Sequence, residues 1–197
     1  MLMNIENLSK GAEEFTANAY LIGKKVLIDV GKGEEVRKKI AKLEDIEKVL
    51  ITHSHYDHVD NLQHIVEEND PEVYAFSQKI KGIETNKLKD KKTVKTGQNT
   101  VFEALHTPGH KNDHLCFYNE DEGVLFSGDL VFANGGFGRT DLAEGDRDKL
   151  IQSIKKVREN CDIKCLYPGH DEPVLENGNK WVKESLENAE KREKKYD

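Results

Sequence analysis

Four side chains that commonly bind metal ions lie within the segment T-H-S-H-Y-D-H at residues 52–58. His53 and His55 are two residues apart, so in extended backbone they project to the same side and can hold one ion. Asp57 and His58 follow where the chain must turn into a helix, so their side chains diverge and can serve a second ion. A string of this type arises by chance in roughly one sequence of this length in a thousand. The segment therefore predicts a metal centre rather than a solvated histidine-rich loop.

Two ions need more ligands than four side chains provide, and further His and Asp residues follow later strands. His110 lies in H-T-P-G-H, where proline and glycine predict a tight turn just past a strand. Asp129 follows an apolar run in S-G-D, and His170 follows another in Y-P-G-H. Each of these residues alone is more often an ordinary turn residue. Three recurrences at strand ends indicate a shared site.

The elements that position these side chains can be located from hydrophobic periodicity. Segments 34–43, 59–66, 146–159 and the chain from residue 179 onward have helical period. The stretch 79–99 is polar and lysine-rich and is expected to form a surface excursion. Short apolar runs predict strands at 20–23, 26–30, 49–52, 73–76, 101–105, 115–118, 124–127 and 165–167.

The order of these elements predicts the fold class. Strands follow one another directly in places and are separated by helices in others, which favours an α/β sandwich of mixed sheets flanked by helices over a regular doubly wound sheet. No segment rich in Pro, Gly or Ser divides the chain, and 197 residues are enough for one substantial core. The expectation is one domain over residues 1–197.

Composition narrows the classes of partner. The formal charge of -7 repels phosphate backbones, so nucleic acid is not an expected partner. No run approaches the roughly 18 apolar residues that span a bilayer, so no membrane insertion is expected. Three cysteines, of which Cys161 and Cys165 are spaced C-x-x-x-C, fit a reduced cytoplasm better than a disulfide framework.

The strings H-S-H-Y-D-H, T-P-G-H, S-G-D and P-G-H, in this order and over most of the chain, resemble those of the metallo-β-lactamase superfamily. The resemblance implies a four-layer αβ/βα sandwich, two mixed β-sheets flanked by helices, with a metal centre at one edge of the sheets. It also implies two divalent ions, with zinc expected and iron or manganese as alternatives. The implied ligands are His53, His55 and His110 for the first ion, Asp57, His58 and His170 for the second, and Asp129 between the two.

Local sequence separates the branches of this superfamily. Asp129 stands where the best-known lactam-cleaving members have cysteine, and His55 stands where the diiron flavoproteins have glutamate. The segments T-P-G-H-K-N-D-H-L-C-F-Y and G-F-G-R-T-D-L are most similar to glyoxalase II, the hydroxyacylglutathione thioesterase. Full-length enzymes of that type carry a longer helical C-terminal region that helps to hold glutathione. The resemblance therefore implies a small-molecule thioester as substrate and leaves the identity of its thiol open.

Two alternatives remain at this level. A persulfide dioxygenase, which the G-R-T-D string also resembles, uses one Fe(II) on residues matching His53, His110 and Asp129, a facial set suited to dioxygen. A protein that binds metal without catalysis is the other. Structural zinc sites are usually closed by four protein ligands, whereas seven ligands for two ions leave room for water, which favours an enzyme.

The expected reaction is hydrolysis, in which two metal ions lower the pKa of a bridging water and polarise a carbonyl group. Asp57 is expected to orient this water as well as to bind metal, and is the predicted catalytic residue. His64 and His114 are interpreted as packing or surface residues, and Arg139 with Asp141 as an ion pair that braces a loop. The sequence does not identify the residues that contact substrate or the oligomeric state.

Overall fold

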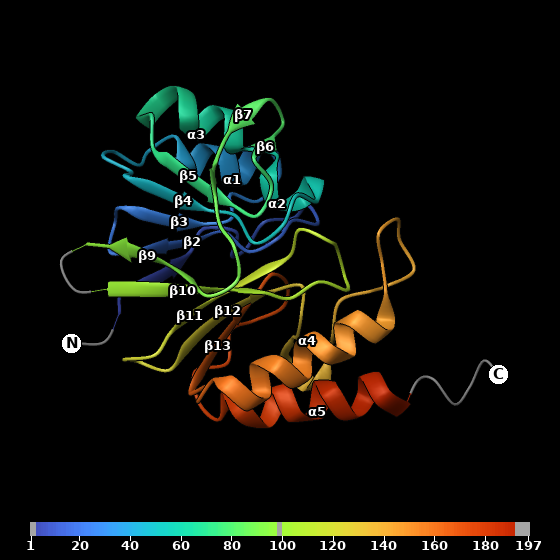
Figure 1. The fold of residues 1–197 in the computed structure, drawn as a ribbon. Helices are drawn as coiled ribbons and strands as arrows, with labels where there is room; N and C mark the ends of the chain where they lie inside the picture. Colours follow the sequence, from blue (N-terminus) through green and yellow to red (C-terminus); the bar gives the residue numbers. More distant parts are fainter. Residues whose placement is uncertain (1–2, 98–99, 192–197) are drawn as a thin grey trace.

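The computed structural model describes residues 3–97 and 100–191. Two mixed β-sheets pack face to face, and helices cover the outer face of each sheet, as Figure 1 shows. This is the four-layer αβ/βα arrangement expected from the sequence, so the predicted fold class is confirmed.

The first sheet combines antiparallel and parallel strands. Its order is β1 (Ile5–Asn7), β2 (Tyr20–Ile22), β3 (Val26–Ile28), β4 (Lys48–Leu50), β5 (Glu72–Ala75) and β8 (Asn86–Lys87). Strands β3, β4, β5 and β8 are parallel, and such pairs need crossover connections. The helices α1 (Gly33–Ile40), α2 (Tyr56–Val59) and α3 (Leu62–Asn69) lie in the first two of these connections.

The second sheet is antiparallel except at one edge. Its order is β13 (Cys165–Pro168), β12 (Val124–Gly128), β11 (Leu115–Asn119), β10 (Thr100–His106) and β9 (Lys92–Thr96). Strands β12 and β13 are parallel, and the connection between them contains the short 3-10 helix η1 (Ala133–Gly135) and α4 (Arg147–Asn160). Helix α5 (Gly178–Lys191) follows β13 and packs beside α4 (Figure 1).

Three apolar layers hold the sandwich together. Val36 and Ile40 of α1 pack in the layer between the first sheet and its helices. Aromatic side chains, among them Phe102 and Phe117, fill the space between the two sheets. Leu150 of α4 belongs to the third layer, beneath α4 and α5. Burial of this kind is the main force that fixes strand ends relative to one another.

The stretch 79–99 was expected to form a surface excursion, and most of its described residues are exposed, but it also contains strands that the hydrophobic periodicity did not predict. Four short strands lie there: β6 (Lys79–Ile80), β7 (Ile83–Glu84), β8 and β9, and residues 98 and 99 lie outside the described part of the chain. In β9, Val94 and Thr96 face inward while Lys92 and Lys95 are exposed. Lysines on a sheet edge oppose pairing with other chains, so this composition suits an edge strand.

None of the helices in the described ranges is both long and apolar enough to cross a lipid bilayer.

Candidate metal centre

Strand ends from both sheets meet at one edge of the sandwich. His53 follows β4 of the first sheet, whereas His110, Asp129 and His170 follow β10, β12 and β13 of the second. Backbone hydrogen bonds join these segments, with Leu115 N–H donating to the Thr52 carbonyl at 2.7 Å and Gly169 N–H to the Gly128 carbonyl at 2.8 Å. Residues more than a hundred positions apart therefore form a common site.

Three histidines converge at one side of this site. The Nδ1 atom of His55 lies 3.0 Å from Nε2 of His53 and 2.8 Å from Nε2 of His110. These three nitrogens form one of the clusters that could hold a metal ion. The arrangement matches the first ligand set expected from the sequence.

A second cluster contains Asp57, His58 and His170. Nε2 of His170 lies 3.2 Å from Oδ2 of Asp57. Asp129 lies between the two clusters, with Oδ1 3.3 Å from Nε2 of His58 and Oδ2 3.4 Å from Nε2 of His110. All seven candidate ligands predicted from the sequence are thus brought together.

Two atoms of the site show that the residues fit a cation. Nε2 of His58 and Oδ1 of Asp129 are buried and make no hydrogen bond. Buried polar atoms in folded proteins are nearly always paired, so each exception needs an explanation. A metal ion between these side chains would satisfy both atoms.

The electrostatics of the two clusters differ. Burial lowers the pKa of His53 well below its ordinary value and that of His55 to about 4. Both imidazoles are therefore neutral, and each can offer a nitrogen lone pair to a metal ion. Burial opposes protonation of His170 as well, but hydrogen bonds to Asp129 and Asp57 raise its pKa to about 9. The same negative potential that holds a proton there favours a divalent cation.

Buried partners fix the orientation of several candidate ligands. The carboxylate of Asp29 accepts hydrogen bonds from His58 Nδ1 at 2.7 Å, from the Thr52 hydroxyl at 2.7 Å and from the Thr52 N–H at 2.8 Å. His110 Nδ1 donates to the carbonyl of Arg139 at 2.7 Å. In both histidines the bond at Nδ1 leaves Nε2 directed into the centre.

His114 positions the backbone at Asp129. Its Nε2 accepts the Asp129 N–H at 3.0 Å, so the ring proton is on Nδ1, which donates to the Thr107 hydroxyl at 2.8 Å. Burial lowers the pKa of His114 to about 3, which keeps the ring neutral and Nε2 available as an acceptor. His114 is therefore buried beside the site, where it holds the Asp129 backbone. The sequence predicted only a packing or surface role for it.

A family model described as the metallo-beta-lactamase superfamily matches residues 12–170. The chain belongs to the metallo-β-lactamase superfamily.

Individual relatives are consistent with this membership. The chain is 36% identical over 148 residues, 72% of its length and 54% of the relative's, to a hydroxyacylglutathione hydrolase of Pseudoalteromonas translucida. It is 31% identical over 195 residues, 90% of its length and 57% of the relative's, to an atrochrysone carboxyl ACP thioesterase of Aspergillus fumigatus. The chain spans somewhat more than half the length of these curated relatives.

A solved structure also resembles this metallo-β-lactamase fold. The protein TTHA1623, solved in a di-iron-bound form, has a TM-score of 0.67 and 28% identity, with coverage of 87% of this chain and 92% of that one.

Two glycines are required by the packing of the superfamily site. A Cβ on Gly169 would lie 2.3 Å from Oδ1 of Asp129 and 2.8 Å from Cε1 of His58. Gly128 has a φ of +48°, and a Cβ there would lie 2.6 Å from Nε2 of His114. The glycines of S-G-D and P-G-H therefore allow neighbouring segments to approach the candidate ligands.

The loop after Asp129 reaches over the His110 side of the centre. The predicted ion pair is present, with the guanidinium of Arg139 bound to both carboxylate oxygens of Asp141 at 2.7 and 2.8 Å. Lys111, next to His110, forms a second pair with Glu144 at 2.7 Å. The first pair lies within the loop, whereas the second joins the loop at Glu144 to the residue beside His110.

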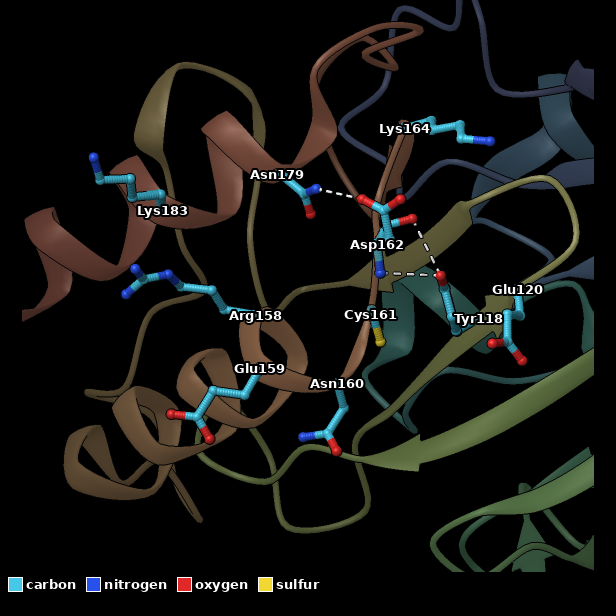
Figure 2. Close-up of a pocket in the computed structure, with 10 residues that line it drawn as sticks. All are labelled: Tyr118, Glu120, Arg158, Glu159, Asn160, Cys161, Asp162, Lys164, Asn179 and Lys183. Carbon is cyan, nitrogen blue, oxygen red and sulfur yellow. Dashed lines mark hydrogen bonds between the residues drawn. The ribbon is translucent and has the colours of Figure 1, made fainter.

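A hollow of about 730 Å³ lies at the opposite end of the second sheet, where β11 ends and α4 meets α5. Figure 2 shows Asp162 held there by the Tyr118 hydroxyl and by the amide of Asn179. The basic side chains of its lining are balanced by acidic ones, so the hollow has no excess charge to select an ion. The charged residues are Arg158, Lys164 and Lys183 against Glu120, Glu159 and Asp162.

Sequence reasoning missed Asp29 completely. It follows β3 in the string I-D-V-G, with an apolar run before it and a φ of 55°. An aspartate in a left-handed conformation at a strand end is an ordinary turn residue. Only a pairing between strands β3 and β4 would have placed its carboxylate beside His58.

Proposed function

We propose that this protein is a metal-dependent thioesterase whose centre holds two zinc ions on seven residues. The observation that carries the proposal is the position of Asp129 between a three-histidine cluster and the Asp57, His58 and His170 cluster. In this assignment Asp129 is shared, and each cluster holds one ion. The two relatives support the thioester class, because one is named a thioesterase and the other a hydrolase of hydroxyacylglutathione, itself a thioester.

Bound zinc ions would supply Lewis acidity, making water acidic enough to act as a nucleophile near neutral pH and polarising the substrate carbonyl. Asp57 orients the attacking water in this scheme. Burial opposes ionisation of Asp57, but the hydrogen bond to His170 and the charge of His58 lower its pKa, so the carboxylate is ionised and accepts a hydrogen bond. The leaving thiolate is a weak base and requires no dedicated acid.

A third histidine favours this assignment over a single-iron dioxygenase. Dioxygen-activating iron sites typically take two histidines and one carboxylate and leave other positions open. Nδ1 of His55 lies 3.0 Å from Nε2 of His53 and 2.8 Å from Nε2 of His110, so a third histidine is in place beside Asp129 to complete the first site. The di-iron form of TTHA1623 shows that a related chain accommodates two ions.

A reducing setting such as the cytoplasm is consistent with the cysteines. Cys116, Cys161 and Cys165 are all free in the described structure. We infer that the protein works where thiols remain reduced.

The decisive assay compares two reactions. Zinc-loaded protein is expected to release free thiol from acyl thioesters of N-acetylcysteamine, detected with a chromogenic disulfide, and the Asp57→Asn variant to be strongly impaired. Iron-loaded protein is expected to consume no oxygen with glutathione persulfide. Oxygen uptake without thioester hydrolysis would contradict the proposed thioesterase activity and indicate a dioxygenase.

A further inference from the structure

The ring of Phe15 lies against the metal centre although most of its side chain faces solvent. Phe15 is 73% exposed, and its ring stacks on that of His170 with a centroid distance of 4.8 Å and an interplanar angle of 16°. One face of the ring thus covers a candidate ligand, and the other is free. An isolated exposed apolar residue needs no explanation, but this one borders the proposed reaction site.

The backbone on the C-terminal side of Phe15 is anchored to the centre. Ala17 N–H donates to the Asp57 carbonyl at 3.3 Å, and Asn18 N–H donates to the Gly169 carbonyl at 2.7 Å. The Asn18 side chain also donates to the carbonyls of Pro168 and Asp171, on either side of His170. The loop between β1 and β2 therefore holds Phe15 at the rim without enclosing its ring.

One further aromatic side chain, Phe132, borders the same ligand. Phe132 lies edge-on to His170 with a centroid distance of 6.0 Å, whereas the ring of Tyr56, next to Asp57 in sequence, lies near the ammonium groups of Lys32 and Lys81. Only four large apolar side chains in the described ranges are exposed: Phe15, Tyr56, Leu142 and Leu175. Of these four, Phe15 is the one whose ring stacks on a candidate ligand, so it presents exposed aromatic surface where substrate must approach.

We propose that Phe15 is a specificity-determining residue that binds an apolar group of the substrate on the free face of its ring. The inference rests on the proposed function, since the scissile bond is taken to lie at the ligands that Phe15 covers. The apolar group belongs either to the acyl part or to the thiol part of the thioester. Each methylene that the ring removes from water should strengthen transition-state binding by roughly fourfold.

Two substrate series test this role and distinguish the two sources. The acyl series compares acetyl with hexanoyl thioesters of N-acetylcysteamine, and the thiol series compares S-ethyl with S-hexyl thioacetate. Phe15→Ala is expected to lower kcat/KM about tenfold or more for the longer member of one series and less than twofold for the short members. Phe15→Tyr retains the aromatic ring and should keep the wild-type preference for the longer substrate.

Leu175→Ala is the matched control. Leu175 is 63% exposed, but its carbonyl accepts from Cys165 Sγ at the start of β13, the end of that strand away from His170. This variant should behave as wild type with all four substrates. Equal effects of Phe15→Ala on short and long members of both series, with metal content unchanged, would overturn the inference and leave the thioesterase intact.

A binding measurement keeps the inference testable if no thioester is hydrolysed. Calorimetry on zinc-loaded protein reports the apolar preference without turnover, with acetate and hexanoate for the acyl part and ethanethiol and hexanethiol for the thiol part. In one of the two pairs, wild type should bind the longer member at least tenfold more tightly than the shorter, and Phe15→Ala should lose this ratio. Equal affinities within both pairs in the wild type would overturn the role of Phe15 even where the proposed function had already failed.

Discussion

Nδ1 of His58 lies 2.7 Å from Oδ2 of Asp29, and both side chains are buried. The carboxylate also accepts two hydrogen bonds from Thr52, the residue before His53. Asp29 thus links β3, the end of β4 and the first turn of α2. It fixes the ring of a candidate ligand and the backbone of the metal-binding segment together.

Asp29→Asn should weaken metal binding without unfolding the protein. The amide keeps the size of the side chain but cannot accept all three hydrogen bonds, so metal affinity should fall about 10- to 100-fold. The free energy of unfolding should fall by about 1.5 to 3 kcal/mol, as for lost hydrogen bonds to charged groups. A chelator competition and urea unfolding measure the two quantities. Asp70→Asn, at an exposed left-handed position with φ 48°, is the control, and an equal loss in both variants would contradict the role of Asp29.

Gly169→Ala should disrupt the centre by steric conflict. The new Cβ would collide with the Asp129 carboxylate and the His58 ring, and such overpacking typically costs about 1 to 3 kcal/mol. We expect the variant to fold with reduced metal content, measured by elemental analysis. Gly82→Ala is the matched control, since its φ of +89° imposes strain while nothing lies within 4 Å of the added Cβ. Full metal content in Gly169→Ala would refute the packing argument.

Asp57→Asn separates turnover from binding. With metal supplied in excess, kcat should fall about 100-fold or more while KM changes little, because the neutral amide has neither the charge nor both acceptor oxygens with which the carboxylate orients the attacking water. Steady-state kinetics on the acetyl thioester provide both constants. A kcat equal to that of wild type would remove Asp57 from the mechanism.

The buried thiols predict a loss of stability in alkali. Burial raises the pKa of Cys116 to about 12, above the unfolded value of 9.0. Its contribution is complete below pH 9 and is lost as pH rises from 9 toward 12, by about 2 kcal/mol at pH 10.5. Urea unfolding at pH 8 and pH 10.5 should show a smaller loss in Cys116→Ala than in wild type. Cys165→Ala, at a half-buried thiol, is the control, and identical pH dependence in all three proteins would contradict the assignment.

The sequence predicted the seven candidate ligands because their signals are local. The spacing of His53 and His55 gives a shared direction along extended backbone, and Asp129 directly follows an apolar run. Glycine and proline mark the turns before His110 and His170. Each strand end carries its own sequence signal, so the candidate ligands of a centre assembled from several strand ends can be predicted one at a time.

Other parts of the site depend on pairing that is distant in sequence. Asp29 reaches His58 only because β3 and β4 are neighbours, and His114 is recognised only by its bond to the Asp129 backbone. Phe15 reads as an isolated aromatic until the loop brings it onto His170. Strand β9 was missed because its outward lysines mask the inward Val94 and Thr96. For Asp29, His114 and Phe15, the role in the site becomes visible only from tertiary contacts and not from the residue type.

The number of metal ions per chain tests the central proposal most directly. Protein stripped of metal, then given zinc, iron and manganese together and freed of excess, should retain two zinc ions per chain by elemental analysis. His106→Ala, at a ring that donates to the Asn112 carbonyl outside the centre, should also retain two, whereas Asp129→Ala should lose at least one. A wild-type protein that retains a single iron ion under these conditions would contradict the two-zinc centre.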